Sequence, residues 1–418
     1  MEEGQILQDM TFLMENYQND YYNMEDMKGL LYDAVNEILE MAVSHGFEGD
    51  LWHNYLTYLM ASHENAYSTS CEIVGPVDGS INQVALHDFE IFKELFDYDF
   101  ADLENVMGVD CISMLHDYVG TSGHGSVFNQ RIRDRICDLS KALAETETAV
   151  EFKDIMTQFY KEFGVGKLGL HKAFRIAHTE EGALIEPITK IAHVHLDDLV
   201  GYEIAKKKLI DNTKAFVEGK KANNCLLFGD AGTGKSSSIK AILNQYYDQG
   251  LRMIEVYKHQ FKDLNDVIAQ IKNRNYKFII YMDDLSFEEF EIEYKYLKAV
   301  IEGGLEKKPD NVLIYATSNR RHLIRETFKD KEDRDEELHT NDTVQEKLSL
   351  VARFGVTIYF GKPDKKQFQE IVRELAKKNG IDMPDDELLL EANKWELSHG
   401  GLSGRTAQQF IDYLAGTR

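Results

Sequence analysis

Apolar residues recur at helical spacing through the first part of the chain, up to about residue 190. In three segments the apolar positions lie three and four residues apart, so they share one face of a helix that packs against a core. A loop is expected at 75–79, where Gly and Pro interrupt the pattern. We therefore predict a mostly α-helical N-terminal domain over residues 1–190. The three stripes are Leu31, Ala34, Val35, Ile38, Leu39 and Ala42; Ile132, Ile136, Leu139 and Leu143; and Phe152, Ile155, Met156, Phe159 and Phe163.

The pattern changes after residue 191, where short apolar runs alternate with helical segments. Short apolar strands separated by helices are typical of a parallel sheet that is covered on both faces. The sequence therefore predicts an α/β core over residues 191–361. A charged segment at 330–346, which is poor in large apolar residues, is expected to be an exposed excursion from this core. The strand-like runs are 224–228, 252–257, 277–282, 312–317 and 356–360.

The last part of the chain, 362–418, has only helical patterns after Pro363. Helices are predicted at 365–378, at 385–397, and from just after Ser403 to residue 414. Gly380 is expected to end the first of them, and Ser403 is expected to be the N-cap of the third. These three helices predict a small helical lid that follows the α/β core.

The chain is strongly acidic, with a formal net charge of −25 over 418 residues. Residues 1–50 hold twelve Asp and Glu against a single cation, Lys28, so this part of the chain repels phosphate backbones. The charge argues against broad nucleic-acid binding, although a local basic patch stays open. The simpler interpretation of the acidic stretch is a solvated surface that keeps the protein in solution.

The cysteines and the hydropathy pattern indicate a cytoplasmic protein. Four cysteines are scattered without any CxxC or CxxH spacing, which fits reduced thiols better than disulfides or a zinc site. No apolar stretch approaches the ~18–20 residues that cross a bilayer. The acidic start MEEGQ is not a signal peptide. We therefore expect no contact with a membrane.

The clearest candidate site is the segment 229–236, which follows an apolar strand-like run and precedes a helical pattern. Its sequence, GDAGTGKS, is a complete P-loop (Walker A) motif in strand–loop–helix context. Such a loop points backbone N–H groups at a β-phosphate, and the helix N-terminus adds positive potential. Lys235 is expected to reach the β- and γ-phosphates, and the Ser236 hydroxyl to ligate Mg²⁺. The sequence therefore predicts nucleoside triphosphate binding by Gly229, Asp230, Ala231, Gly232, Thr233, Gly234, Lys235, Ser236 and Ser237.

Two carboxylates follow the apolar strand-like run at 277–282, as in a Walker B motif. Asp283 is expected to bind Mg²⁺ beside Ser236, directly or through water. Asp284 is then placed to orient or polarise the attacking water as a general base. The pair therefore predicts a hydrolytic site rather than a simple binding loop.

Three further polar residues are candidates for catalysis. Asn319 closely follows the strand-like run at 312–317 and is expected either to hydrogen-bond the attacking water or γ-phosphate, or to cap the next turn. Arg353 precedes the last strand and is expected to act as an arginine finger on a neighbouring subunit, or to satisfy the carbonyls at a helix end. Arg320 and Arg321 compete with it for that role. Arg405, at the start of the last helix, is expected to reach the γ-phosphate within its own subunit.

These parts, in this order along the chain, resemble those of the AAA+ ATPases. The segment 195–203 resembles the stretch before their P-loop, which implies that Val200, Gly201 and Tyr202 lie near the adenine. The resemblance implies an α/β fold, namely a P-loop AAA+ core with a five-stranded parallel sheet and a C-terminal helical lid. It further implies hydrolysis of ATP to ADP with Mg²⁺, and assembly of identical subunits into a ring or open ring.

A closer resemblance is to a bacterial AAA+ group known as domain of unknown function number 815. This resemblance covers about residues 195–415 and extends weakly into the helical N-terminal region. The segments that carry it are 223–229 (NNCLLFG), 283–288 (DDLSFE), 302–306 (EGGLE), 315–323 (YATSNRRHL) and 346–350 (EKLSL).

Two departures from the AAA+ pattern shape the functional hypotheses. Asp284 stands where most AAA+ proteins have Glu, and its side chain is one methylene shorter, which makes hydrolysis less secure than binding. No aromatic–aliphatic–Gly pore loop follows the second strand, since 257–259 (YKH) is a poor substitute, and this weakens a threading mechanism.

Three functional hypotheses stay open at this point. The leading one is an oligomeric ATPase that remodels or loads an unidentified protein partner, with the N-terminal domain as adaptor. The second is an ATP-dependent binding switch with little turnover. The third is a DNA-associated loader, which rests on analogy with the fold and is disfavoured by the acidic charge.

Overall fold

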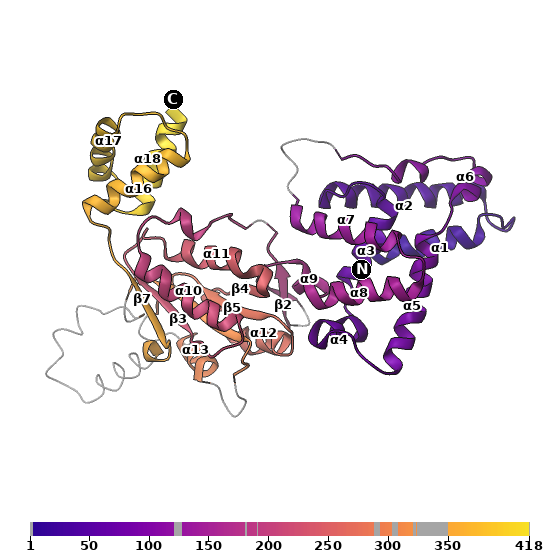
Figure 1. Ribbon diagram of the computed structural model, residues 1–418, viewed down its shortest axis with the longest axis horizontal. Coiled ribbons are helices and arrows are strands. Elements are labelled where there is room, and N and C mark those ends of the chain that lie inside the picture. The colour runs from indigo at the N-terminus through magenta and orange to yellow at the C-terminus, as the bar shows by residue number, and fades with distance from the viewer. Residues whose placement is uncertain are drawn as a thin grey trace. The chain divides into compact units, whose positions relative to one another are not determined.

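The computed structural model describes residues 3–120, 128–179, 182–189, 191–287, 293–302, 308–320, 323 and 350–417 (Figure 1). The chain divides into two compact units, Met1–His171 and Lys172–Arg418. Several predicted features lie outside the described residues. They are the charged excursion at 330–346, Arg321, and the parts of the family-like segments at 288, 303–306, 321–322 and 346–349.

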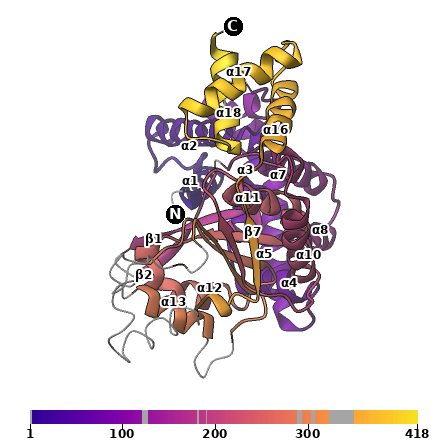
Figure 2. The same cartoon turned by 90° about the vertical axis from the view of Figure 1, so that its left-hand side faces the viewer.

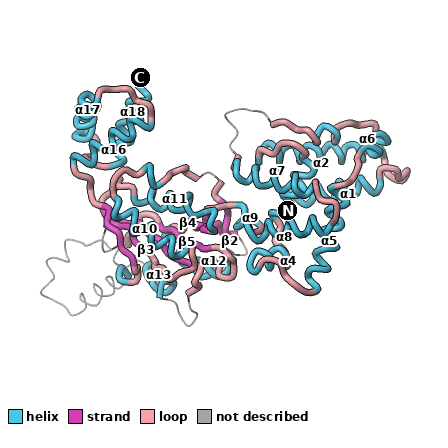
Figure 3. The backbone as a smooth tube through the Cα atoms, in the orientation of Figure 1, coloured by secondary structure: helices cyan, strands magenta, loops and turns pink. Residues whose placement is uncertain are grey.

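The first unit is built from helices, as the sequence predicts (Figure 3). All three predicted stripes contribute to one apolar core, which confirms the helical pattern for this part of the chain. Its helices are α1 (Glu3–Asn16), α2 (Met24–His45), α3 (Leu51–Ser62), α4 (Ala66–Val74), α5 (Ser80–Phe96), α6 (Ala101–Met107), α7 (Gln130–Ala144), α8 (Ala149–Phe163), α9 (Gly166–Leu170) and the 3₁₀ turn η1 (Ser113–Leu115).

Local side chains set where these helices begin. At five N-termini a short polar side chain accepts a hydrogen bond from a backbone N–H of the first turn, which has no partner within the helix. Buried polar atoms of the core are paired as well. Trp52 Nε1 donates to the Leu95 carbonyl at 2.9 Å, and Tyr160 OH donates to the Met60 carbonyl at 3.1 Å. The capping residues are Asn23, Asp50, Asn65, Asn129 and Thr148.

The second unit contains one sheet with the strand order β2-β1-β4-β5-β6-β3-β7. All five predicted strands are present, and they lie side by side as the parallel block β4-β5-β6-β3-β7. The strands β5 and β6 are buried almost throughout, as expected where helices cover both faces. The strands are β1 (Ala173–Thr179), β2 (Gly182–Pro187), β3 (Cys225–Gly229), β4 (Leu251–Glu255), β5 (Lys277–Met282), β6 (Val312–Ser318) and β7 (Val356–Phe360).

The sheet of the described residues has seven strands, so the five-stranded expectation was wrong in number. Residues 173–187, which the sequence analysis assigned to the helical region, form a hairpin at the sheet edge. Its strand β1 runs parallel to β4, with Ala173 opposite Met253, and β2 pairs antiparallel to β1. The apolar alternation of this hairpin is short, and its pairing depends on β4, more than seventy residues away. The compact units accordingly divide near 171, while the three-domain division stays a prediction.

Helices cover both faces of the sheet (Figure 2). The helices α10 (Glu203–Val217) and α11 (Lys235–Tyr246) share one apolar cluster with the strands, and α12 (Leu264–Ile271) and α13 (Glu293–Glu302) lie on the other side. The short 3₁₀ turns are η2 (Leu196–Asp198), η3 (Tyr247–Gln249) and η4 (Lys258–Asp263). The strands β3, β5 and β6 are parallel neighbours in this block, so their carboxyl ends meet at one edge of the sheet.

The helical lid has its own apolar core, and its three predicted helices are confirmed. They are α16 (Lys365–Lys378), α17 (Asp385–Ser398) and α18 (Gly404–Thr417). Asp364 and Gln367 form a capping box at the start of α16. Ser403 Oγ accepts from the Thr406 N–H at 3.0 Å, as predicted for an N-cap. In the part of the chain that the structure describes, no helix is both long and apolar enough to span a membrane.

The edge hairpin gives a test of the fold. Phe174 on β1 is fully buried, whereas its neighbour Arg175 points to the exposed face of the same strand. Phe174→Ala is expected to lower the opening free energy of the β4 amides by about 3–5 kcal/mol, because it leaves a cavity. Arg175→Ala, the matched control, should change it by less than about 1 kcal/mol, since its ion pair with Glu186 is exposed. Hydrogen exchange measures both, and equal protection in the two variants would contradict β1 as part of the sheet.

Candidate functional site

The P-loop connects β3 to α11 at the carboxyl edge of the sheet. Gly229 has a φ of 135°, and a Cβ built there would lie 2.1 Å from the Phe360 carbonyl oxygen on β7. Gly232 has a φ of 74°, and its Cβ position lies 3.1 Å from Ser403 Oγ and from Arg405 Cβ of the lid. Larger residues at these two positions would strain the loop and push it against β7 or the lid.

The Lys235 ammonium is the centre of the site. Its side chain is only 6% exposed. Nζ donates to the carbonyl oxygens of Gly229 at 2.9 Å and Asp230 at 2.6 Å, and to Asn319 Oδ1 at 3.0 Å. A lysine has three N–H donors, so all three are used. Burial lowers the pKa of this ammonium, and the nearby carboxylates of Asp230, Asp284 and Asp283 oppose that shift. A phosphate oxygen that binds Lys235 must therefore displace one of these acceptors.

The carboxylate of Asp283 lies directly beside the first turn of α11. Its Oδ1 accepts hydrogen bonds from Ser236 Oγ at 2.7 Å and from Thr317 Oγ1 at 2.5 Å. Burial alone would raise the pKa of Asp283, but the hydrogen bonds from Thr317 and Ser236 outweigh it and hold the pKa below its usual value. An ionised carboxylate next to a hydroxyl is the oxygen donor set that Mg²⁺ prefers.

Asp284 follows in a strained backbone conformation, with a φ of 49° in the left-handed region. Its N–H donates to Thr317 Oγ1 at 2.9 Å, and its Oδ1 accepts from Asn319 Nδ2 at 2.8 Å. Asn319 thus bridges two charges, with its carbonyl toward the Lys235 ammonium and its amino group toward the Asp284 carboxylate. The predicted Walker A lysine, strand-end asparagine and candidate base form one hydrogen-bonded chain.

The segment before α10 connects the P-loop region to the lid. Tyr202 OH donates to the Gly361 carbonyl at 2.8 Å, and its ring lies 5.2 Å from that of Phe360. Burial raises the pKa of Tyr202 to about 12, so the phenol stays a neutral donor. Val200 packs against the apolar core of the lid, and Gly201 adopts a φ of 79° between the two. The predicted adenine contact of these residues stays a prediction.

A charged pair joins the same segment to α16. Lys378 Nζ donates to Asp198 Oδ1 at 2.7 Å and to the Asp197 carbonyl at 3.2 Å. The hydrogen bond from Lys378 is the main cause that lowers the pKa of Asp198. At the P-loop, the Arg405 N–H of the lid donates a hydrogen bond to the Gly232 carbonyl at 3.2 Å. The lid therefore contacts the candidate site at two places.

Arg405 lies beside the P-loop, as its predicted role requires, with an exposed side chain that acts electrostatically on Lys235. Arg353 is elsewhere: its guanidinium donates to the Glu302 carboxylate at the end of α13. Among the described residues, no contact of Arg353 with the P-loop is present. Arg320 is exposed, and its N–H donates to Ser318 Oγ at 3.1 Å.

The remaining predicted P-loop residues differ in what they contact. Asp230 Oδ2 accepts from the Lys362 N–H at 2.9 Å, and its carbonyl accepts from Thr233 Oγ1 at 2.8 Å, so its roles in this structure are structural. Ala231 is exposed and Ser237 is half-buried on α11.

Thr317 is the residue that sequence reasoning missed. The signal for it was a hydroxyl at the end of an apolar strand, next to the end of β5, but its two partners became visible only in the folded sheet. The Asp198–Lys378 pair was missed too, since 180 residues separate its members.

A parallel block in which the P-loop strand lies between β6 and β7, followed by a helical lid, defines the AAA+ class of P-loop folds. The chain matches the family described as "Protein of unknown function (DUF815)" over residues 169–418. Since the match covers more than half of the chain, the protein belongs to that family.

Solved structures that are similar to part of the chain include the following two. The RuvB Holliday junction branch migration motor of Thermotoga maritima is 16% identical with a TM-score of 0.37, over 52% of this chain and 63% of that chain. The chain therefore spans less than two thirds of RuvB. The FIGL-1 AAA domain in complex with ADP is 17% identical with a TM-score of 0.37, over 55% of this chain and 74% of that chain. No curated protein matches.

The double contact of Thr317 gives a stability test. Thr317→Val keeps the shape but removes the hydroxyl, and with it the hydrogen bond to the Asp283 carboxylate and the shorter of the two hydrogen bonds that the Asp284 N–H donates. Stability should therefore fall by about 1–3 kcal/mol near pH 7. The loss also raises the pKa of Asp283. Because its pKa is lowered in the folded state, the Asp283 carboxylate stabilises the fold at pH values above the usual Asp pKa of about 4, and this contribution is lost as the pH falls below that value. The difference in stability between variant and wild type should therefore shrink as the pH falls through that range.

The control is Thr357→Val on β7, where the threonine is exposed. Its effect should stay within about 0.5 kcal/mol at every pH. Urea denaturation at a series of pH values measures both. A Thr317→Val effect that equals the Thr357→Val effect would contradict the hydrogen bonds described here.

Proposed function

We propose that this protein binds Mg²⁺-ATP at the P-loop and hydrolyses the ATP at a site shared between subunits of a homo-oligomer, to remodel or load a protein partner. The observation that carries this proposal is the hydrogen-bonded chain from Lys235 through Asn319 to Asp284. This chain links Lys235, the cation that would bind phosphate, to the candidate base Asp284 through Asn319, the residue that a γ-phosphate would contact first.

The residues at the P-loop fit a triphosphate. The positive-φ glycines leave the loop without side chains that would block a phosphate, and the N-terminus of α11 contributes a favourable potential. A phosphate oxygen that replaces Asn319 Oδ1 on Lys235 keeps the three donors of the ammonium satisfied. Arg405 in the first turn of α18 is close enough to the loop to add a second cation when the lid closes.

Ser236 and Asp283 would hold Mg²⁺, since their oxygens lie 2.7 Å apart and the carboxylate stays ionised. The metal would neutralise charge on the phosphates and orient them. Displacement of Asn319 from Lys235 also weakens its hold on the Asp284 carboxylate. Asp284 is then available to accept a proton from the attacking water, and Thr317 keeps its backbone in position.

A neighbouring subunit would supply the remaining cation. Arg353 is held by Glu302 within its own subunit and makes no described contact with its own P-loop. An arginine in the turn just before β7 is suited to act on a neighbour, where it would stabilise charge in the transition state. This requires an assembly of identical subunits, which we propose as part of the function.

The N-terminal unit is proposed to bind the protein partner. It carries 31 Asp and Glu against 9 Lys and Arg, so it holds −22 of the net charge of −25. This charge repels nucleic acid, and no described feature favours the DNA-loader hypothesis.

A binding switch with little turnover is the second candidate. The Asn319–Asp284 hydrogen bond and the short Asp284 side chain favour it, because both hold the carboxylate back from a water near the γ-phosphate. For both candidate functions we propose that the protein is located in the cytoplasm.

Two substitutions should separate nucleotide binding from ATP hydrolysis. Lys235→Ala should weaken Mg²⁺-ATP binding at least about tenfold in calorimetry, because it removes a buried charge-assisted contact. Lys366→Ala, an exposed lysine on α16, is the matched control and should bind as wild type does. Asp284→Ala should bind ATP but show no turnover. Wild-type protein that takes up no ATP would overturn the proposal, and steady binding with turnover below about 0.1 s⁻¹ would select the switch.

The shared site predicts complementation. Arg353→Ala and Asp284→Ala should each be inactive alone, whereas an equal mixture should regain about a quarter of the wild-type rate. Random mixing places an intact Asp284 against an intact Arg353 at one interface in four. Turnover per subunit should also rise with protein concentration. No recovery in the mixture, together with a concentration-independent rate, would contradict a shared site.

The ion pair between Arg353 and Glu302 should compete with the contact that Arg353 would make at the site of a neighbouring subunit. Glu302→Gln is therefore expected to lower the protein concentration at half-maximal turnover by up to about fivefold, the scale of one exposed ion pair. The same change is also followed as the protein concentration at half-maximal assembly, and in the inactive Arg353→Ala background it should leave that concentration unchanged, which isolates the pair. A Glu302→Gln effect that persists in that background would mean that Glu302 acts on something else.

A further inference from the structure

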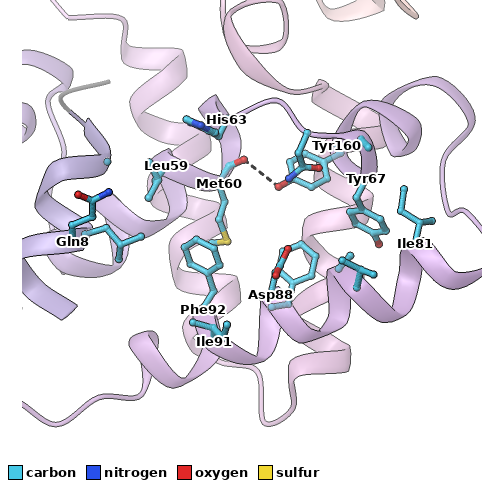
Figure 4. A pocket seen from close by; sticks show the side chains of 17 residues that line it. Gln8, Leu59, Met60, His63, Tyr67, Ile81, Asp88, Ile91, Phe92 and Tyr160 are labelled. Atoms are coloured by element: carbon cyan, nitrogen blue, oxygen red, sulfur yellow. Dashed lines mark hydrogen bonds between the residues drawn. The ribbon is translucent and has the colours of Figure 1, made fainter. Parts of the chain in front are cut away.

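The N-terminal unit has an apolar groove that the ATPase site does not use. It has a volume of about 570 Å³ and lies among α1, α3, α4, α5 and Tyr160 of α8 (Figure 4). Figure 4 shows Met60 and Phe92 pointing toward one another in the middle of this groove. The α5 residues that line it form one continuous helix face: Ile81, Val84, Ala85, Asp88, Phe89, Ile91 and Phe92.

This face is exposed although it is apolar. Val84 is 64% exposed and Ile91 is 46% exposed, and Leu7 and Phe92 are only partly buried. Exposed apolar side chains that gather around a hollow, rather than being scattered singly, mark an interaction site. Nothing among the described residues of the unit covers this one.

The dimensions of the groove match a helix. Its α5 side runs from Ile81 to Phe92, which is about 17 Å of helix at 1.5 Å per residue, or three turns. The opposite side is the turn Gly4 to Gln8 of α1. The apolar lining residues of α5 lie three, four and seven residues apart, as in Ile81–Val84, Ala85–Phe89 and Val84–Ile91. A groove between two helices with this apolar spacing is suited to receive the apolar face of a third helix.

The two tyrosine hydroxyls of the groove are not free to orient a small polar ligand. Tyr160 OH is used by the Met60 carbonyl, and Tyr67 OH is paired with Thr157 Oγ1 at 2.7 Å. A small-molecule site needs convergent polar groups that orient the ligand, and these two are already satisfied.

Charge indicates which helix fits. The helices α1, α3, α4 and α5 carry seven Asp and Glu and one Lys between them. That lysine, Lys93, is buried and paired with Asp97 at 2.5 Å. Asp88 lines the groove, is exposed, and has no hydrogen-bond or ion-pair partner in the part of the chain that the structure describes. The surroundings are therefore negative, and a basic flank complements them.

We propose that this groove binds an amphipathic helix of a partner protein, about three turns long, with an apolar face of Leu, Ile, Phe or Met and flanks of Lys or Arg. The proposal deepens the proposed function, because it rests on the N-terminal unit being the partner-binding part. It does not depend on nucleotide chemistry.

The test uses the full chain and a fluorescein-labelled peptide of about 14 residues, made of Leu at i, i+3, i+4 and i+7 spacing and Lys elsewhere. Val84→Lys and Ile91→Lys should each weaken its binding at least about tenfold in fluorescence anisotropy, since both place an unpaired charge in the apolar contact. Val43→Lys on α2 is the matched control, because Val43 is 65% exposed and lies outside the groove. It should change the affinity less than about twofold.

A second peptide tests the charge. The same Leu pattern with Glu in place of Lys should bind at least about tenfold more weakly, and Asp88→Asn should weaken the Lys peptide about threefold at low salt. Equal loss in Val43→Lys, equal binding of the Glu peptide, or displacement of the peptide by decanoate at micromolar concentration would each overturn the proposal. The last outcome would assign the groove to a small apolar ligand instead.

Calorimetric ATP binding on the same samples keeps the two proposals apart. Val84→Lys should bind Mg²⁺-ATP as wild type does and melt at the wild-type temperature, which shows that it is folded. If the wild type does not bind ATP, the proposed function is rejected and the result for the groove still holds. Peptide binding that is insensitive to every groove variant would reject the groove alone.

Discussion

The Lys235 ammonium is nearly buried at the bend between β3 and α11, and its three donors are shared between two loop carbonyls and Asn319. A buried cation must keep these contacts or exchange them for others of equal strength, because an unpaired charge in this environment is very costly. The P-loop, the end of β6 and the candidate base are arranged around this requirement. Since Asn319 is the one side chain among the three acceptors, it is the contact that a phosphate most readily replaces.

The position of the lid depends on contacts with the P-loop and with the segment before α10. Its last helix donates a backbone hydrogen bond to Gly232, its first helix holds Asp198, and Tyr202 fixes the start of the connection at Gly361. A ligand in the P-loop therefore changes the surroundings of at least one lid contact. A bound nucleotide would thereby have a physical route to the lid through hydrogen bonds and one exposed ion pair, which are weak enough to rearrange.

The two units divide the physical properties of the chain. The second unit is nearly neutral, because only −3 of the net charge belongs to residues 172–418, and it contains the candidate phosphate site. The first unit holds the remaining charge and the apolar groove. Acidic flanks around an apolar floor would attract a basic partner over a distance and bind it through burial on contact, while rejecting nucleic acid.

Much of the fold followed from local patterns. The five core strands, the lid helices, the Ser403 cap and the helical stripes of the N-terminal unit depend on residues within a few positions of each other, and each was predicted to within a few residues. The hairpin at 173–187 was not, because an edge strand with a short apolar pattern takes its conformation from the strand that it pairs with.

The candidate site divides in the same way. By itself the sequence determined the P-loop, which we propose holds a triphosphate, since it is a continuous motif whose geometry follows from glycines and the helix that starts after them. Only the tertiary structure decided how those residues are used: Thr317 holding Asp283 and Asp284, Asn319 between two charges, and Arg353 paired with Glu302. It also decided that the apolar face of α5 stays uncovered. These are contacts between segments far apart in the chain, and their energies depend on distance and burial, which no local pattern records.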